Sequence, residues 1–290
     1  MKTAILTDSN SGISSLQAKE WGLFMLPMPV ILDDKTRWEG VDLFDEEFFG
    51  QLKELAQVTT SMPSPGDITD LWDKIFSEGY EEIVYIPMSS GLSSSCSTSA
   101  MLAEDYGKPV YVVDNHRISV GMRESVLEAL EMASAGMDGK EIQAYLEETG
   151  LMSTTYLGVD TLEYFRRGGR ITTAGATLAS VLNLKPVLKA KGEVFDSFAK
   201  VRGMKRAKSK IVEALREEYD SNYAHLGQDN IAIGTAGSGL TEDQAESWRA
   251  QVQAEFPDIP VYYTPLSYSI SCHTGFGAYG AAIAIHKHFS

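Results

Sequence analysis

The sequence predicts an α/β protein with two domains: an N-terminal three-layer α/β/α domain with a parallel sheet (residues 1–150) and a smaller C-terminal mixed α/β domain (residues 151–290). Two observations predict this division. Short apolar runs alternate with helical patterns through the first half, as in βαβ units. The second half carries strands separated by turns rich in Gly and Arg. We expect a ligand site where the two domains meet.

In the first half, apolar runs and turn signals define strands and helices in alternation. Pro27 and Pro29 forbid a helix interior in the second apolar run, and Ile83–Ile86 are typical of a strand buried on both faces. The expected strands are 3–6, 23–32, 82–88 and 110–113. The expected helices are 46–56, 68–78, 94–106, 120–133 and 139–148, with Gly150 as a stop.

In the second half, three apolar runs predict strands, at 153–159, 231–235 and 261–264. Between the first two we expect a hairpin around Lys191–Gly192 and a helix at about 206–219. This mixture of elements is what suggests a separate, mixed α/β domain.

Composition limits the classes of function. The net charge of −15 argues against nonspecific nucleic-acid binding, and two cysteines suit a reducing compartment. The longest apolar stretch is about half a membrane span, so we expect a soluble, cytoplasmic protein. Residues 162–216 nevertheless hold 13 Lys or Arg against 4 Asp or Glu. This basic region is either a solvated face or a docking surface for an acidic or phosphate-bearing partner.

Two polar loops are the strongest local signals, Thr59–Pro65 and Ser89–Ser95. Each follows a strand and precedes a helix, which is where an open α/β sheet binds ligands and where backbone N–H groups receive anions. Neither loop contains a charged side chain. If both follow strands of one sheet, they face one crevice and form a site for a small anionic head group.

Ser93 admits three interpretations. Gly91-Leu92-Ser93-Ser94-Ser95 nearly matches the G-x-S-x-G nucleophile elbow, and the chain order Ser93, Asp160 or Asp229, His273 suits a hydrolase. The closing glycine is missing, however, and no Gly-rich oxyanion loop follows an early strand. Helix capping or ligand binding by Ser93 remains open on spacing alone.

His273 lies between polar residues and the glycines Gly275 and Gly277, which predict a tight loop close to another group. The other histidines, His116, His225, His286 and His288, show no ligand spacing. The cysteines lack CxxC partners, so the sequence predicts no metal site. The Gly-rich segment 234–239 lacks the GKS/T ending of a phosphate loop.

Taken in order, these motifs resemble the DegV family, which includes the FakB fatty-acid-binding subunits of bacterial fatty acid kinase. The resemblance runs from residue 3 to about 285. The matching segments are Thr7-Asp8-Ser9, Thr60-Ser61-Met62-Pro63-Ser64-Pro65, Ser89-Ser90-Gly91-Leu92-Ser93, Val112-Val113-Asp114, Phe165-Arg166-Arg167-Gly168-Gly169-Arg170-Ile171 and His273-Thr274-Gly275-Phe276-Gly277.

The resemblance implies a non-catalytic carrier that holds one long-chain fatty acid in an internal tunnel, with no cofactor. It implies carboxylate binding by Thr60, Ser61, Ser93 and His273, and docking of an ATP-dependent kinase subunit at Arg170 and Arg202. The kinase would phosphorylate the carboxylate to an acyl phosphate. Transient membrane contact for lipid exchange is a further expectation, and nucleic acid is not expected as a partner.

Two other functions remain open on the residues. One is a serine hydrolase of lipids that uses Ser93 and His273, and the other is a binder of another apolar carboxylate without a kinase. Ser94, Ser95 and Asn115 depart from the residues usual in the family without removing a proposed head-group ligand, and three further departures are Met62, Cys96 and Phe276. We expect these three side chains to alter the pocket wall.

Overall fold

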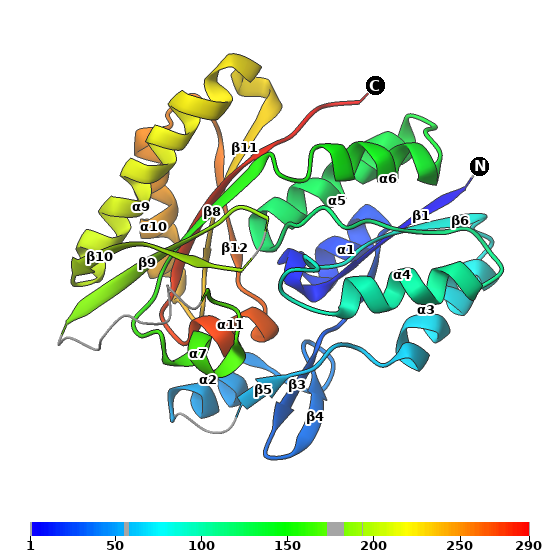
Figure 1. The fold of residues 1–290 in the computed structure, drawn as a ribbon, viewed down its shortest axis with the longest axis horizontal. Helices are drawn as coiled ribbons and strands as arrows, with labels where there is room; N and C mark the ends of the chain where they lie inside the picture. The colour runs from blue at the N-terminus through cyan, green and yellow to red at the C-terminus, as the bar shows by residue number, and fades with distance from the viewer. Residues whose placement is uncertain (1, 55–57, 173–182, 193, 290) are drawn as a thin grey trace.

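The structure, a computed structural model, describes residues 2–54, 58–172, 183–192 and 194–289. Its first sheet is parallel, with the strand order β2-β1-β6-β7 (Figure 1). These strands are β1 (Thr3–Asp8), β2 (Phe24–Leu26), β6 (Glu82–Ile86) and β7 (Val110–Val112). The parallel sheet predicted for the first half is confirmed.

Helices cover both faces of this sheet, which explains the unbroken apolar run of β6. Ile83 and Tyr85 pack toward α3 (Pro65–Ser77) and α4 (Ser95–Asp105). Val84 and Ile86 pack on the opposite face, toward α5 (Ser119–Ser134) and α6 (Gly139–Glu148). Successive side chains of a strand point to opposite faces, so a strand with helices on both sides is apolar throughout.

A second, small antiparallel sheet has the order β4-β3-β5 and lies beside the parallel one (Figure 1). Asp33 and Asp34 join its first two strands with φ angles of 48° and 61°, the backbone that a two-residue hairpin requires. The single extended segment expected at 23–32 is therefore two strands in two sheets. The elements here are α1 (Ser15–Trp21), β3 (Pro29–Leu32), β4 (Lys35–Trp38), α2 (Asp45–Lys53) and β5 (Val58–Thr60).

The second half forms a mixed sheet of six strands in the order β10-β9-β8-β13-β11-β12. The predicted hairpin around Lys191–Gly192 joins β9 to β10, which pair antiparallel. The central strand β13 lacks a sequence prediction, because four of its seven residues are Gly or Ala, which give no strand pattern. The strands are β8 (Ser153–Gly158), β9 (Leu184–Ala190), β10 (Asp196–Arg202), β11 (Ile231–Gly237), β12 (Val261–Pro265) and β13 (Tyr279–Ile285).

Two amphipathic helices, α9 (Met204–Glu218) and α10 (Glu242–Glu255), cover the outer face of the six-stranded sheet (Figure 1). Two short helices, α7 (Glu163–Gly168) and α11 (Tyr268–Thr274), contact each other beside the small sheet. Among the described helices, none is both long and apolar enough to cross a bilayer.

Helix α5 lies between the parallel sheet and the six-stranded sheet and contacts strands of both. Its buried residues Val120, Met122 and Val126 belong to one continuous core. That core also contains Ile5 of β1 and Ala282 of β13. The domain boundary near residue 150 thus crosses a shared hydrophobic core, and we retain that boundary as a proposal.

Candidate functional site

A cavity of about 280 Å³ lies where the three sheets come together. Its polar wall carries Thr60, Ser61, Ser93, Arg170 and His273. The wall also has a large apolar part, made of Met28, Met88, Leu92, Ile118, Phe165, Phe195 and Ile270. The structure therefore brings together all four residues predicted to bind a head group.

Thr60 reaches the cavity from the end of β5, where it pairs with Val30 of β3. This strand belongs to the small antiparallel sheet, so the expectation that both polar loops follow strands of one sheet is wrong. The physical reason is that the two prolines divide the preceding extended segment between two sheets. The loops still meet at one cavity, because the small sheet packs beside the parallel one.

Ser93 lies in the loop between β6 and α4 and is half-buried in the cavity wall. Its Oγ accepts a hydrogen bond from the backbone N–H of Ser95, at 3.2 Å. Ser94, at the N-cap position, makes no such bond. Ser93 thus combines the capping and the cavity-lining interpretations. Because its oxygen already accepts one N–H, its own proton is free to donate to an anion.

His273 occupies the last turn of α11, where the sequence predicts a tight loop. That prediction is wrong by a few residues, because the chain leaves the helix only at Gly275, whose φ is 76°. The Nε2 atom of His273 lies 3.1 Å from Oγ1 of Thr60. Burial, and then the positive charge of Arg170, lower the pKa of His273 to about 4. The imidazole is therefore neutral at pH 7 and acts as a hydrogen-bonding group.

This geometry argues against the hydrolase. A serine hydrolase needs its histidine bonded to the nucleophile and oriented by a carboxylate on the other ring nitrogen. Here Nε2 faces Thr60 instead of Ser93, and Nδ1 of His273 is buried without a hydrogen-bond partner among the described residues. Among the described residues, His273 therefore makes neither the bond to the serine nor the bond to a carboxylate that a serine hydrolase requires.

Arg170 lies in the cavity wall rather than on an open surface, and it is half-buried. Its Nε donates to the backbone oxygen of Leu92 at 3.0 Å, and a second guanidinium nitrogen contacts the oxygen of Gly168. The site is therefore not built from neutral donors alone, as the two loops suggested. The loop sequences lack this signal because Arg170 comes from the second half of the chain.

Gly168 leaves the space that the His273 ring occupies. A Cβ atom at position 168 would overlap the Nδ1 and Cε1 atoms of the imidazole. The next residue, Gly169, ends α7 with φ of 68°, a left-handed conformation that favours glycine. The two glycines of the Arg-rich motif thus have different roles, one in close packing and the other in the turn.

Asp8, at the end of β1, positions the Ser89–Ser95 loop. Its carboxylate accepts hydrogen bonds from the backbone N–H of Met88 at 2.9 Å and of Asn10 at 2.8 Å. Complete burial is the dominant effect on this group and raises its pKa to about 6. The Asp in the first motif is therefore a structural link between neighbouring strand ends.

Two further hollows adjoin the cavity. A small inner one, of about 20 Å³, shares Ile118, Phe195 and Ile270 with it and continues between α5 and the six-stranded sheet. Except for Ser119 and Thr155 its lining residues are apolar or glycine. An outer hollow of about 510 Å³ shares Thr60, Arg170 and His273 and adds Tyr164 and Arg167. The polar wall thus lies between an apolar interior and a basic opening.

The three departures from the family pattern have different outcomes. Met62 lines the cavity, and its sulfur accepts a hydrogen bond from Ser94 Oγ at 3.3 Å, linking the two polar loops. Cys96 is instead buried against α3 and β6, on the far face of the parallel sheet. Phe276 packs against Phe49, outside the cavity wall. Met62 thus lies in the cavity wall, where its effect on the wall stays a prediction, and the expectation is wrong for the other two.

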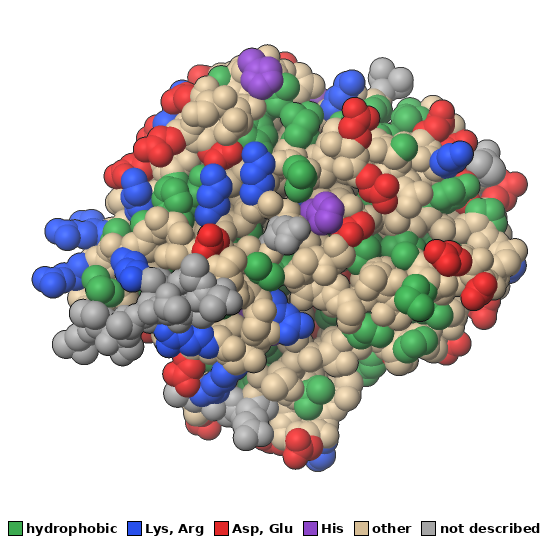
Figure 2. All heavy atoms as spheres, viewed as in Figure 1, with side chains coloured by type: hydrophobic (Ala, Val, Ile, Leu, Met, Phe, Trp, Pro, Cys, Tyr) green, Lys and Arg blue, Asp and Glu red, His purple; other side chains and the backbone are tan. Residues whose placement is uncertain are grey.

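Arg202 is exposed at the end of β10, away from the cavity. Lys and Arg side chains gather over β9, β10 and the start of α9 (Figure 2). Lys200, Lys205 and Arg206 are exposed there as well. The part of the basic region that lies over β9, β10 and the start of α9 is therefore a surface, and its role as a docking surface stays a prediction.

Known proteins resemble this chain over nearly its whole length. A DegV domain-containing protein from Deinococcus radiodurans is 30% identical over 285 residues, covering 98% of each chain. The structure of a DegV family protein from Thermus thermophilus, described for its fatty-acid binding, is 28% identical with a TM-score of 0.86, covering 98% of this chain and all of that one. DegV from Bacillus subtilis, described as a fatty-acid-binding protein, is 27% identical with a TM-score of 0.85 and covers 98% and 99%.

A stearic-acid-binding protein from Eubacterium ventriosum shares the fold, with a TM-score of 0.86 at 18% identity over 98% of both chains. The family model described as "Uncharacterised protein, DegV family" matches residues 2–286. Proteins of this family bind fatty acids in solved structures. Because the family model matches residues 2–286, which include all three sheets around the cavity, this chain belongs to the DegV family.

Proposed function

We propose that this protein binds one long-chain fatty acid, with the carboxylate at the polar wall and the acyl chain directed into the apolar interior. The observation that carries the proposal is the state of two hydroxyls. The Oγ atom of Ser93 accepts an N–H, and Oγ1 of Thr60 lies 3.1 Å from His273 Nε2. When Nε2 carries the proton it donates to Thr60, so both hydroxyl protons are left to donate to a carboxylate.

The positive charge of Arg170 attracts the carboxylate, while hydrogen bonds from the two hydroxyls fix its orientation. The guanidinium is already engaged by two backbone oxygens, so it acts on the carboxylate mainly through its field. His273 is a positioning residue that orients the Thr60 hydroxyl. Burying about 14 methylenes at about 0.8 kcal/mol each gives on the order of 11 kcal/mol before association costs, so the tail supplies most of the affinity.

We further propose that the bound carboxylate is presented to an ATP-dependent kinase subunit, which converts it to an acyl phosphate. The outer hollow supports this step, because it joins the polar wall to an opening that holds Arg167 and Arg170, where a phosphate chain would approach. The exposed basic surface over β9 and β10 is the proposed docking surface. In this scheme the present chain contributes no catalytic residue and Ser93 is a binder.

The test begins with denaturing mass spectrometry of lipid extracted from the protein after bacterial expression. One long-chain fatty acid per chain supports the carrier. The loaded protein is then mixed with a fatty acid kinase subunit and ATP, and acyl phosphate is measured. Binding without phosphorylation would reduce the proposal to a fatty-acid binder. Esterase turnover together with covalent labelling of Ser93 by a fluorophosphonate would overturn it.

A further inference from the structure

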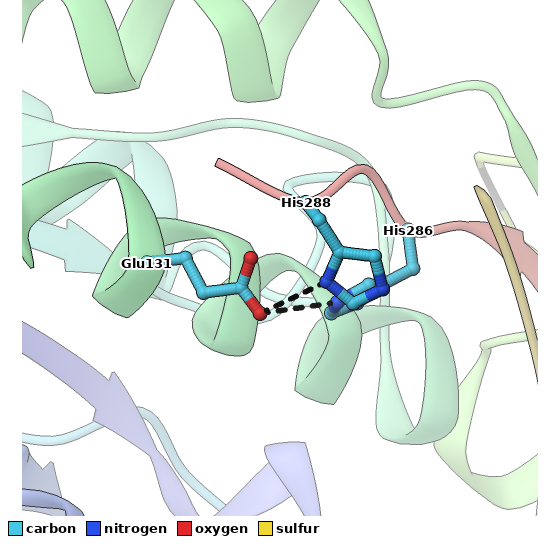
Figure 3. A group of neighbouring side chains, drawn as sticks. All are labelled: Glu131, His286 and His288. Atoms are coloured by element: carbon cyan, nitrogen blue, oxygen red, sulfur yellow. Dashed lines mark hydrogen bonds and ion pairs between the residues drawn. The ribbon is translucent and has the colours of Figure 1, made fainter. Parts of the chain in front are cut away.

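Two histidines that follow β13 face an acidic residue near the C-terminal end of α5, whereas the opposite end of this helix, at Ile118, lines the fatty-acid cavity. His286 and His288 both point toward the carboxylate of Glu131 (Figure 3). Nε2 of His286 lies 3.6 Å from Oε1 of Glu131, and Nδ1 of His288 lies 3.3 Å from the same oxygen. None of the three residues lines the cavity of about 280 Å³.

The spacing of these atoms suits a small divalent ion. The three ligand atoms lie within 4.8 Å of one another. A tetrahedral zinc ion with bonds of about 2.0–2.1 Å places its ligand atoms about 3.3–3.4 Å apart. The His288–Glu131 contact, at 3.3 Å, already has this separation, and the His286–Glu131 contact, at 3.6 Å, is slightly longer. His288 is 65% exposed, so its ring is free to make the small rotation that would complete the set.

A neighbouring carboxylate orients the His286 ring. Nδ1 of His286 lies 2.7 Å from Oε2 of Glu124, and both side chains are nearly buried. Two acceptors do not approach this closely, so Nδ1 carries a proton, and whenever the ring is neutral its lone pair is at Nε2. In the neutral ring that lone pair faces the Glu131 oxygen, an arrangement that a cation between the two atoms would stabilise. A carboxylate behind a metal-binding histidine is the common outer-sphere arrangement.

Backbone contacts hold the segment in place beside α5. The N–H of Lys287 donates to Glu128 at 2.9 Å, and the N–H of Phe289 donates to Oε2 of Glu131 at 3.1 Å. The second bond uses one oxygen of Glu131 and leaves the other, Oε1, directed at both imidazoles. The ligands are thus arranged by the fold before any ion arrives.

We propose that Glu131, His286 and His288 form a binding site for a transition-metal dication of the zinc class. Two imidazoles and one carboxylate are a ligand set that zinc accepts, with a fourth position left for water. The bound ion would tie the segment after β13 to α5 and so stabilise the folded protein. The sequence predicts no metal site, because Glu131 is remote in the chain and two histidines alone do not define one.

A different charge state is the competing explanation. If His286 is doubly protonated, it bridges Glu124 and Glu131 as an ion pair, and no metal is needed. The two explanations differ in their response to metal. An imidazolium between two carboxylates has no lone pair for a metal, so a metal would have to displace its proton, whereas the proposed site binds one equivalent through lone pairs that are already available.

The experiment is a titration of the full-length, untagged and chelator-treated protein with Co²⁺ at pH 7.5, followed by visible absorption. We expect saturation at one equivalent with the bands of a four- or five-coordinate ion, which Zn²⁺ then abolishes by displacement. His288→Ala should weaken binding by roughly tenfold or more, since even outer-sphere changes cost 10–100-fold. His225→Ala, at an exposed histidine elsewhere, is the matched control and should bind as the unmodified protein does.

Thermal unfolding gives a second readout that does not depend on colour. Zn²⁺ should raise the Tm of the unmodified protein and of His225→Ala, and leave the Tm of His288→Ala unchanged. Because His288 is exposed, its removal should not prevent folding. The proposal would be overturned if the protein showed no saturable binding at one equivalent. It would also be overturned if His288→Ala and Glu131→Gln bound the metal as tightly as the unmodified protein does.

Discussion

Thr60 Oγ1 and His273 Nε2 lie 3.1 Å apart, although 213 residues separate them in the chain. This contact joins the small antiparallel sheet to α11 at the polar wall of the cavity. It places the hydroxyl beside an imidazole that burial keeps neutral. The proposed head-group site therefore depends on elements from both halves of the chain.

Removing the Thr60 hydroxyl tests the proposed carboxylate contact. Thr60→Val keeps the β-branched shape of the side chain and should leave the fold intact. One lost hydrogen bond to a charged group corresponds to about 1.5–3 kcal/mol, or roughly a 10- to 150-fold weaker Kd for the fatty acid. Competition with a fluorescent fatty acid measures this. Thr36→Val, exposed in the same small sheet, is the control, and an equal loss there would assign the effect to the sheet.

The pKa of His273 predicts how stability depends on pH. Its folded-state pKa is lowered to about 4 from the ordinary 6.5. Between these values the unfolded chain binds a proton that the folded protein does not, so the free energy of unfolding falls as pH drops from 6.5 toward 4. The full contribution is on the order of 3 kcal/mol. Urea unfolding of ligand-free protein across this range measures it.

Asp8, whose pKa is raised to about 6, changes the free energy of unfolding with pH in the opposite direction over the same range. The His273 contribution is therefore measured as a difference between variants. His273→Gln should lose the His273 component, while His225→Gln should retain it. A bound carboxylate favours imidazolium, so fatty acid should lessen the loss of stability at acid pH in the unmodified protein and in His225→Gln, but not in His273→Gln. Identical pH profiles for His273→Gln and the unmodified protein would contradict the assignment.

Close packing at Gly168 makes a sharp prediction. Gly168→Ala should displace the His273 ring and weaken fatty-acid binding at least as much as Thr60→Val does, because the added methyl overlaps the imidazole. Gly50→Ala, in α2 with open space around it, should be neutral or stabilise the protein by up to about 1 kcal/mol. Ligand affinity and thermal unfolding of both variants provide the comparison. Unchanged affinity in Gly168→Ala would mean that His273 has no part in binding.

The small inner hollow of about 20 Å³ should limit the length of the bound acyl chain. Ala282 of β13 lines it, and Ala282→Leu should fill it and shift the extracted lipid toward shorter chains. Overpacking also costs about 1–3 kcal/mol of stability. Ala284 lies two residues along on the same face of β13 and outside this wall. Ala284→Leu should therefore lower stability by a similar amount without changing the length of the bound acyl chain. Mass spectrometry of the lipid bound to each variant decides between them, and the same chain-length profile in both would place the tail elsewhere.

Charge reversal separates docking from ligand binding. Arg202→Glu should spare fatty-acid affinity and lower the rate of acyl phosphate formation at subsaturating kinase, most strongly at low salt. Arg170→Glu should impair both, because this side chain lies in the cavity wall. Lys19→Glu, exposed on α1, is the matched control. A rate with Arg202→Glu equal to that of the control would remove the β10 surface from docking.

The fold was largely predictable from local pattern. The continuous apolar run of β6 and the Lys191–Gly192 turn carry their structure in short windows of sequence, and each is confirmed, whereas the single segment expected at 23–32 is two strands. Helix α11 is different. Its seven residues are too few to show a helical period, and the glycines after it resemble a loop.

The sequence predicted which residues line the cavity better than it predicted how the elements that carry them are arranged. Thr60, Ser61, Ser93 and His273 all line the cavity, as expected. Pattern alone does not reveal that β5 leaves the parallel sheet, because strand pairing is a long-range choice. The position of Arg170 depends on how α7 packs against the β6–α4 loop, and its backbone partner Leu92 lies 78 residues earlier.

Helix α5 has a consequence for folding cooperativity. Its buried face completes the core of the parallel sheet and of the six-stranded sheet together. If either half unfolded alone, the helix would expose apolar surface on the side it lost, and the surviving half would lose a packed layer. The two halves should therefore unfold in one transition, and the cavity between them keeps its shape as long as α5 remains packed on both sides.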